Sequence, residues 1–232
     1  MPADSVYTVL APDVEIVTAL SRKKSRFLTV MRRTGSPGEA QDLVNSLRKE
    51  HNGARHHCSA WVIGDERRYQ RGNDDGEPNG TAGAPILEAL MKAGTPGGKQ
   101  DFSDVCVVVI RWSGGTLLGA GGLVSAYSDS VVAALEQARE LDAFRTRQRM
   151  LKFELAAPIG EAGRWEHQLR SSLITVHGVD YMSRPGLAVL GLAVTDDGES
   201  LNTLTSLIAA LSGGEAELHS TGDEWLDAPP VS

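Results

Sequence analysis

The stretch DVCVVVIRWSGGTLLGAGGLVSAYSDSVVAALEQAREL, residues 104–141, carries the clearest fold signal in the sequence. It opens with a continuous apolar run, which is typical of a central β-strand that is covered on both faces. A glycine-rich segment at residues 113–123 follows, and apolar residues at helical spacing then predict a helix over residues 124–141. A buried strand that leads through a loop into a long helix predicts a sheet with a helical layer packed on it.

The sequence before this stretch predicts further strands and helices. Upstream strands are expected at residues 27–31, 56–64 and 65–72, the last two as a hairpin. Ser36 is expected to cap a helix, because Pro37 suits its first turn and Glu39 completes a capping box. Another helix is expected over residues 85–94.

The second half of the chain repeats a strand and helix pattern after a polar stretch, RTRQRM, at residues 145–150. The predicted order is strand, helix, strand, strand, helix, strand, which is the βαββαβ order of ferredoxin-like domains. We therefore expect an α+β protein with two domains, residues 1–143 and residues 150–226, and the polar stretch as a linker between them.

The composition limits the classes of function. Most of the net charge of −7 belongs to residues 141–232, which carry −6, so a basic surface over the whole molecule is excluded. No apolar run is long enough for a membrane span, and residues 1–16 lack the pattern of a signal peptide. Cys58 and Cys106 are not expected to pair, and the expected location is cytoplasmic.

The glycine-rich segment is the first candidate ligand site. It opens a helix, and the unpaired backbone N–H groups at a helix start attract anions such as phosphates. Glycine lacks the Cβ atom that would keep an anion away from the backbone. The candidate residues are Gly114, Gly115, Gly119, Gly121 and Gly122, with Arg111 beside them. The spacing matches neither a Walker loop nor G-x-G-x-x-G, so a tight strand-to-helix turn is the alternative.

The acidic stretch DDGEPNGTAGAP, residues 74–85, is the second candidate site. Its candidate residues are Asp74, Asp75, Glu77 and Thr81, with Arg71 just upstream. The carboxylates could hold a divalent cation or act as general acid and base. Alternatively, an aspartate accepts hydrogen bonds within its own turn, and Thr81 caps the next helix. HHC at residues 56–58 has metal-ligand residue types, but strand neighbours point to opposite faces, so no metal site is predicted, and no cofactor is identified.

A basic cluster, SRKKSRF at residues 21–27, is the candidate contact for nucleic acid. Residues 1–140 carry a net charge of only −1, so phosphate contacts would come from a local group of cations. Lys23, Lys24 and Arg26 are the candidates. The alternative is a solvated edge that binds nothing.

Five motifs together resemble the YigZ/IMPACT family over residues 20–140. They are KKSRF (23–27), HHC (56–58), DDGEPNGTAGAPIL (74–87), IRWSGGTLLGAGGL (110–123) and AYS (126–128). The resemblance implies an N-terminal domain with the fold of ribosomal protein S5 domain 2. It also implies a small C-terminal domain similar to a domain of elongation factor G, in agreement with the ferredoxin-like pattern.

The chain departs from the family pattern at three places. The family usually has R-Y-F-G-G where this chain has RWSGG at residues 111–115, and an arginine where Ser125 stands. It also usually has H-N-C in place of HHC. The glycine-rich segment therefore keeps an aromatic residue, Trp112, but lacks one cation at the start of the following helix.

The resemblance implies no established enzymatic reaction. Eukaryotic members resemble the chain only in its first part and act as translational regulators, by competing for a partner of a stress-activated kinase. We therefore expect a non-enzymatic regulator that binds RNA, the ribosome or a translation-associated protein. Two alternatives stay open: an enzyme that acts on a phosphorylated small molecule through the acidic and glycine-rich loops, and an interaction module whose loops only pack together. The acidic stretch is expected to line the same cleft as the glycine-rich segment, with its carboxylates partly engaged in holding backbone N–H groups.

Overall fold

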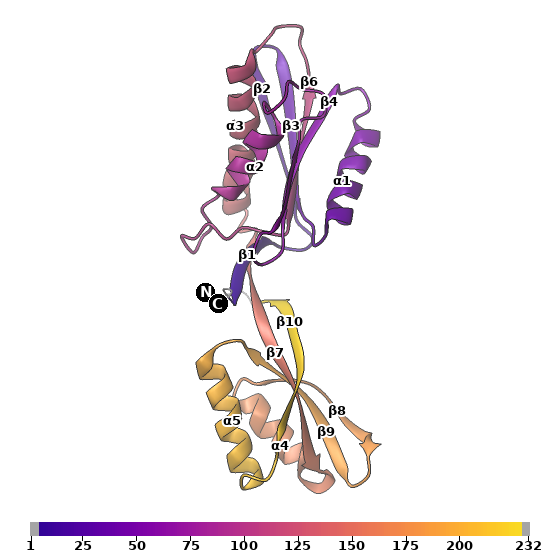
Figure 1. Cartoon of the computed structure of the whole chain (residues 1–232), viewed down its shortest axis with the longest axis vertical. Helices are drawn as coiled ribbons and strands as arrows, with labels where there is room; N and C mark the ends of the chain where they lie inside the picture. Colours follow the sequence, from indigo (N-terminus) through magenta and orange to yellow (C-terminus); the bar gives the residue numbers. More distant parts are fainter. Residues whose placement is uncertain (1–4, 229–232) are drawn as a thin grey trace. The chain divides into compact units, whose positions relative to one another are not determined.

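The computed structural model describes residues 5–228 and divides the chain into two units (Figure 1). The first unit extends to Thr146 and the second begins at Arg147. Both units combine helices with antiparallel sheets, which confirms the expected mixed architecture. None of the described helices is long and apolar enough to cross a membrane.

A five-stranded antiparallel sheet forms the centre of the first unit. In order across the sheet, its strands are β2 (Glu15–Arg22), β3 (Ser25–Arg33), β6 (Val105–Trp112), β4 (His56–Ile63) and β5 (Tyr69–Asn73). β6 lies in the middle, as its apolar run predicted. Its successive side chains enter two separate cores, with Val107 in one and Val108 in the other, because neighbouring strand residues point to opposite faces.

Helices cover both faces of this sheet (Figure 1). Their bounds are α1 (Pro37–Glu50) on one face and α2 (Gly83–Met91) and α3 (Ala120–Glu140) on the other. The predicted start of α1 is confirmed, because the Ser36 hydroxyl accepts a hydrogen bond from the Glu39 N–H at 3.2 Å. The Glu39 carboxylate accepts from the Gly35 N–H at 2.8 Å, one residue earlier than in the usual capping box.

The hairpin of β2 and β3 was only partly predicted. The sequence indicated a strand at residues 27–31, and the structure adds β1 (Val6–Leu10) and β2 before it. Lys23 and Lys24 form the turn between β2 and β3, with φ angles of 43° and 68°. Positive angles at both residues match the twist of a tight hairpin. The basic cluster is therefore the tip of a hairpin.

The helix after the glycine-rich segment begins earlier than predicted. α3 starts at Ala120 and not at residue 124, so Gly121 and Gly122 lie in its first turn. Gly119 is the N-cap residue, with a φ of 76° that other residues rarely adopt. The irregular part of the segment is therefore the short loop of residues 113–119, called the glycine loop below.

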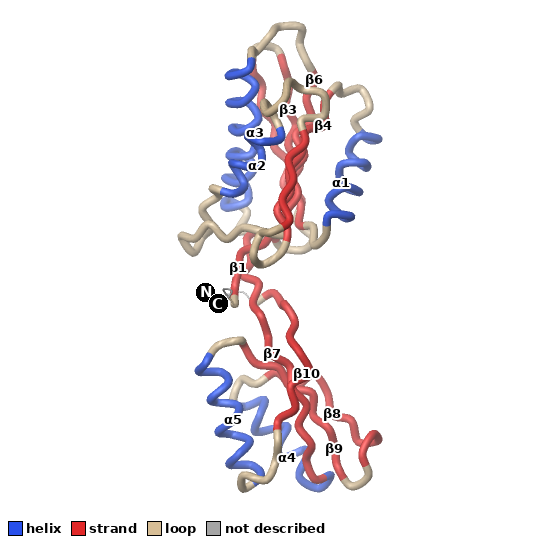
Figure 2. The backbone as a smooth tube through the Cα atoms, viewed as in Figure 1, coloured by secondary structure: helices blue, strands red, loops and turns tan. Residues whose placement is uncertain are grey.

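The second unit has the βαββαβ order that its sequence predicted (Figure 2). Its elements are β7 (Phe144–Pro158), whose first three residues belong to the first unit, α4 (Ile159–Ser171), β8 (Thr175–Arg184), β9 (Leu187–Thr195), α5 (Gly198–Ser212) and β10 (Leu218–Asp227). The strands are antiparallel in the order β10-β7-β9-β8, and both helices share one core with the inner face of this sheet.

The polar stretch at residues 145–150, expected as a linker, is the first part of β7. Arg149 pairs in register with Trp225 of β10, and its guanidinium lies 3.1 Å from the Asp223 carboxylate. Polar side chains suit a strand whose cross-strand neighbours are acidic. Such a strand has no alternation of apolar and polar residues. Because this alternation is missing from residues 145–150, the sequence predicted a linker there.

We expect residues 1–146 and residues 147–232 to fold as separate fragments. Among residues 5–228 the cores of the two units share no side chain, so each fragment keeps its own apolar burial. Urea unfolding followed by circular dichroism should give one cooperative transition for each fragment. A fragment that is unfolded in buffer while the full chain is folded would show that the units depend on each other.

Candidate functional site

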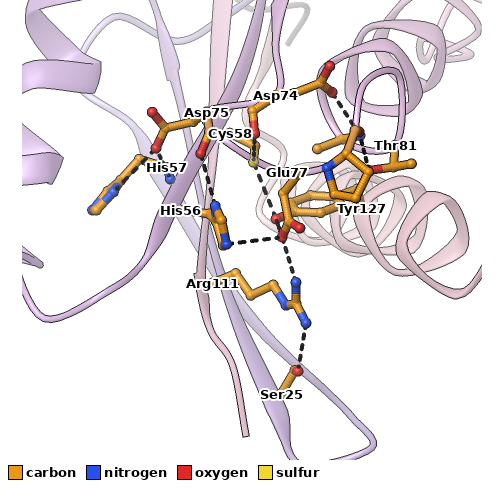
Figure 3. A network of polar contacts seen from close by, with 12 residues as sticks. Ser25, His56, His57, Cys58, Asp74, Asp75, Glu77, Thr81, Arg111 and Tyr127 are labelled. Carbon is orange, nitrogen blue, oxygen red and sulfur yellow. Dashed lines mark hydrogen bonds and ion pairs between the residues drawn. The ribbon is translucent and has the colours of Figure 1, made fainter. Parts of the chain in front are cut away.

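The acidic stretch begins where β5 ends and sends its three carboxylates in three directions (Figure 3). The turn is held by its own groups: the Asn73 side-chain oxygen accepts from the Asp75 N–H at 3.0 Å. Asp75 and Gly76 both have positive φ angles, 42° and 82°. This sharp turn between Asp75 and Glu77 lets their side chains reach opposite faces of the sheet.

Asp74 holds the start of α2. Its Oδ1 accepts hydrogen bonds from the N–H groups of Ala82 at 3.0 Å and Gly83 at 2.8 Å, and its Oδ2 accepts from Gly80 at 2.8 Å. Burial raises the pKa of Asp74, but the three backbone donors outweigh burial and lower it below the ordinary value. Asp74 thus caps a helix whose own N-cap residue is an alanine.

Thr81 does not cap α2, although its position suggested this alternative. Its hydroxyl donates to the Pro78 carbonyl oxygen at 2.6 Å, inside the loop. The sequence pattern favoured Thr81 because capping residues usually adjoin the helix that they cap. Asp74 lies farther upstream and reaches the helix only because the loop folds back.

Asp75 points to the face of the sheet that α1 covers. Its Oδ2 accepts from the His57 N–H at 2.6 Å, and its Oδ1 pairs with Arg48 of α1 at 2.8 Å. Burial raises the pKa of Asp75, but the bonds from Arg48 and His57 outweigh it, so the net shift is downward. This carboxylate therefore ties the loop to β4 and to α1.

Glu77 points to the opposite face and ends in a buried polar cluster (Figure 3). Its Oε1 accepts from Arg111 Nη1 at 2.6 Å and from the Tyr127 hydroxyl at 2.7 Å. The side chains of Glu77 and Arg111 are only 3% and 8% exposed. Arg111 Nη2 also donates to the Ser25 hydroxyl at 3.2 Å. One carboxylate thus connects the acidic stretch with β6, α3 and, through Arg111, the start of β3.

Cys58 extends this cluster from β4. Its thiol donates to the Asp74 carbonyl oxygen at 3.0 Å and lies 3.3 Å from the Tyr127 hydroxyl oxygen. Burial raises the pKa of Cys58 and that of Tyr127, so both groups stay protonated at neutral pH. Cys106 lies in the core on the other face of the sheet, and both cysteines are free.

His56 and His57 point to opposite faces of β4, as strand geometry predicted. His56 Nε2 lies 4.0 Å from Glu77 Oε1. The His57 ring is buried on the α1 side, where burial, followed by the nearby Arg48 charge, lowers its pKa. Within residues 5–228 no three His, Cys, Asp or Glu side chains are grouped to hold a metal ion.

The glycine loop is exposed and packs on the tip of the β2–β3 hairpin. An added Cβ at Gly114 would clash with the Lys24 carbonyl group, so only glycine lets the two backbones approach this closely. Gly115 has a φ of 80°, and an added Cβ there or at Gly121 would meet open space. The loop therefore presents bare backbone to solvent beside two lysines.

The predicted cations of the hairpin tip are all exposed, and one of them lies over an aromatic ring. Lys23 and Lys24 occupy the turn, and the Arg26 guanidinium carbon lies 4.2 Å from the centre of the Trp112 ring. Trp112 is the last residue of β6 and leads directly into the glycine loop. Lys23, Lys24, Arg26, Trp112 and the glycine loop are called the hairpin-tip surface below.

Ser125, where the family usually has an arginine, lies beside another cation. Its hydroxyl donates to the Asp129 carboxylate at 3.0 Å, and Arg22 of β2 pairs with the same carboxylate at 2.5 Å. Asp129 lies one helical turn after Ser125. The positive charge of Arg22 is therefore close to Ser125, but it is paired with Asp129.

Arg71 lies away from the buried cluster. It is exposed on the edge strand β5, with its guanidinium carbon 5.4 Å from the centre of the Trp61 ring. Trp61 belongs to the core on the α1 side, so Arg71 is on the face opposite to Glu77.

The two candidate stretches meet through Glu77. Its partners Arg111 and Tyr127 flank the glycine-rich segment in sequence, whereas Asp74 and Asp75 are bound elsewhere. This differs from the expectation that all three carboxylates line one cleft with the glycines. Tyr127 was not among the predicted site residues, although a phenol on the apolar face of a helix is a signal for a buried hydrogen-bond partner.

Comparison with known proteins finds relatives over much of the chain. The model of the Impact N-terminal domain matches residues 23–135. The IMPACT family member YvyE of Bacillus subtilis is 38% identical over 159 residues, 68% of each chain. The IMPACT family member YigZ of Escherichia coli is 44% identical over 130 residues, 55% of this chain and 60% of the relative. A crystal structure described as that of a hypothetical protein is similar over 92% of this chain and 96% of its own, with 30% identity and a TM-score of 0.63.

The family match covers the residues that organise the first unit. Residues 23–135 include the hairpin tip, the acidic stretch, the glycine loop and the partners of Glu77. The same segment carries the sequence motifs that resembled the family. The chain therefore belongs to the IMPACT family, together with YigZ and YvyE.

Proposed function

We propose that the chain is a non-enzymatic regulator that binds RNA through the hairpin-tip surface. The observation that carries this proposal is the close packing of Gly114 on Lys24, which joins exposed cations, an aromatic ring and bare backbone in one surface. Cations supply most of the affinity for a phosphate backbone, and aromatic rings accept bases. Membership of the IMPACT family supports a regulatory role. We place this role in the cytoplasm, where the protein would bind RNA on the ribosome or next to a translation-associated protein.

The carboxylates of the acidic stretch are engaged in structural bonds, which favours this role over catalysis. Asp74 caps α2, Asp75 binds β4 and α1, and Glu77 is shared between Arg111 and Tyr127. A general base needs a carboxylate oxygen within reach of its substrate. The contacts therefore give no support to the alternative of an enzyme that acts on a phosphorylated small molecule.

We also propose the fold of ribosomal protein S5 domain 2 for the first unit and a ferredoxin-like fold for the second. The strand order β10-β7-β9-β8, with α4 and α5 in one core, supports the second assignment. RNA-binding proteins share the S5-like fold, but a shared fold is only an analogy for function.

Replacing Lys23, Lys24 and Arg26 with alanine should weaken RNA binding and reduce its dependence on salt. Each lost phosphate contact lowers the logarithmic salt slope by roughly 0.7 for a single strand, so the triple variant should lose roughly two units. Anisotropy titrations of a labelled RNA at several salt concentrations measure both effects.

The matched control is the triple variant Arg68→Ala, Lys92→Ala, Lys99→Ala. It also removes three positive charges, but at the other end of the sheet, near the start of β6 and the turn before β5. This control variant should leave the salt slope of RNA binding unchanged. An affinity for RNA that does not change with salt, or RNA binding by fragment 147–232, would contradict the proposal. Either result would favour a protein partner.

A further inference from the structure

We infer that the hairpin-tip surface selects single-stranded RNA by stacking an unpaired base on Trp112. The inference rests on the proposed function and adds the class of RNA and the residue that recognises it. The Trp112 ring is partly exposed at the end of β6, between the hairpin tip and the glycine loop.

The Trp112 ring is held in place, and an exposed guanidinium lies over its face. It packs against the core on the α1 side, and His51 meets it edge-on, with ring centres 5.7 Å apart and planes at 84°. The group over its face is the guanidinium of Arg26, which is an exposed residue. A base can displace this guanidinium or be enclosed between it and the indole, because both planes stack on bases.

Exposed cations also occur next to both strands that neighbour β6 in the sheet. Lys23 and Lys24 form the turn that leads into β3, and Arg55 directly precedes β4, where its backbone N–H donates to the Arg111 carbonyl oxygen at 3.2 Å. Arg111 directly precedes Trp112. Proteins that bind single strands combine such an aromatic platform with positive charge along the backbone path.

The glycine loop follows Trp112 in the chain and carries one exposed apolar side chain. Gly114 and Gly115 follow the ring closely in sequence and carry no side chains, and Leu117 in the same loop is 91% exposed. An unstacked base offers an apolar face that can stack on the Trp112 ring. A duplex keeps its bases stacked inside the helix, so it would contact only the cations.

Trp112→Leu tests the inference against Trp112→Phe, which restores an aromatic ring. For a single-stranded oligonucleotide, the leucine variant should lose roughly 10- to 100-fold in affinity, and the phenylalanine variant should recover most of the loss. The salt slope should stay that of the unaltered protein, because stacking removes no phosphate contact. Affinity for duplex RNA of the same length should not change. Trp225→Leu, in β10 of the second unit, is the control for the loss of an indole.

The outcomes separate this inference from the proposed function. Suppose that the unaltered protein binds RNA with an affinity that falls with salt, and that Trp112→Leu lowers the affinity for single strands and duplexes equally or changes neither affinity. The stacking inference is then overturned and the proposed function stands. If the unaltered protein binds neither form, both are overturned. If the leucine variant does not fold, indole fluorescence provides a second test. The inference predicts that the single strand quenches this fluorescence in the unaltered protein and that the quenching is lost in Trp112→Phe; quenching that persists in Trp112→Phe would overturn it.

Discussion

Replacing Glu77 with alanine is expected to lower the free energy of unfolding of the first unit by about 3–5 kcal/mol. The substitution leaves the Arg111 guanidinium, which is 8% exposed, without its carboxylate. The Tyr127 hydroxyl loses its acceptor at the same time. An uncompensated buried charge is much costlier than the loss of an exposed ion pair. Urea unfolding of fragment 1–146 measures the change.

Companion variants identify the buried charge as the cause. Glu77→Gln keeps a side-chain oxygen near Arg111 and Tyr127 and should lose less than the alanine variant. Glu88→Ala breaks the exposed pair with Lys92 and should have little effect. If Glu77→Ala costs no more than Glu88→Ala, the buried pair does not stabilise the fold.

Replacing Gly83 with alanine is expected to destabilise the first unit by roughly 1–3 kcal/mol or more, although alanine favours helices. An added Cβ at Gly83 would lie 2.8 Å from backbone carbons of Gly72 and Asn73, and one at Gly72 would lie 2.6 Å from the Gly83 carbonyl oxygen. The start of α2 and the end of β5 thus meet backbone to backbone. Asp74 holds the helix start by its N–H groups, so α2 cannot move aside without losing its cap.

Gly53→Ala is the matched control, because an added Cβ at Gly53 meets open space. It should leave the urea midpoint of fragment 1–146 nearly unchanged. A Gly83 variant as stable as this control would show that α2 can shift away from β5 at little cost.

Local signals in the sequence predicted the elements that depend on local chemistry. Ser36, Pro37 and Glu39 lie within one helical turn of each other, so their capping pattern was sufficient to place the start of α1. The unbroken apolar run of β6 was likewise sufficient to place it at the centre of the sheet, because only a strand covered on both faces tolerates such a run.

The arrangement of the acidic stretch could not be predicted in this way. Which face each carboxylate reaches depends on the turn at Asp75 and Gly76, and its partners lie far away in sequence: Arg48 for Asp75, and Arg111 and Tyr127 for Glu77. Similarly, residues 23 and 24 were recognised as basic, but their role as a hairpin turn required the pairing of β2 with β3. Tertiary contacts decide these features, and a single sequence does not display them.

The central position of β6 has a consequence for the order in which the first unit can assemble during synthesis. β6 is the strand that joins β3 to β4, yet it follows both of them in the chain. Until the ribosome has released residues 105–112, the nascent chain holds two separate hairpins, β2–β3 and β4–β5, each with an unpaired inner edge. Unpaired strand edges are templates for association with other chains. Because β6 is synthesised after the strands that it joins, the incomplete nascent chain is the form most exposed to aggregation. Pairing of β6 with β3 and β4 removes both inner edges at once.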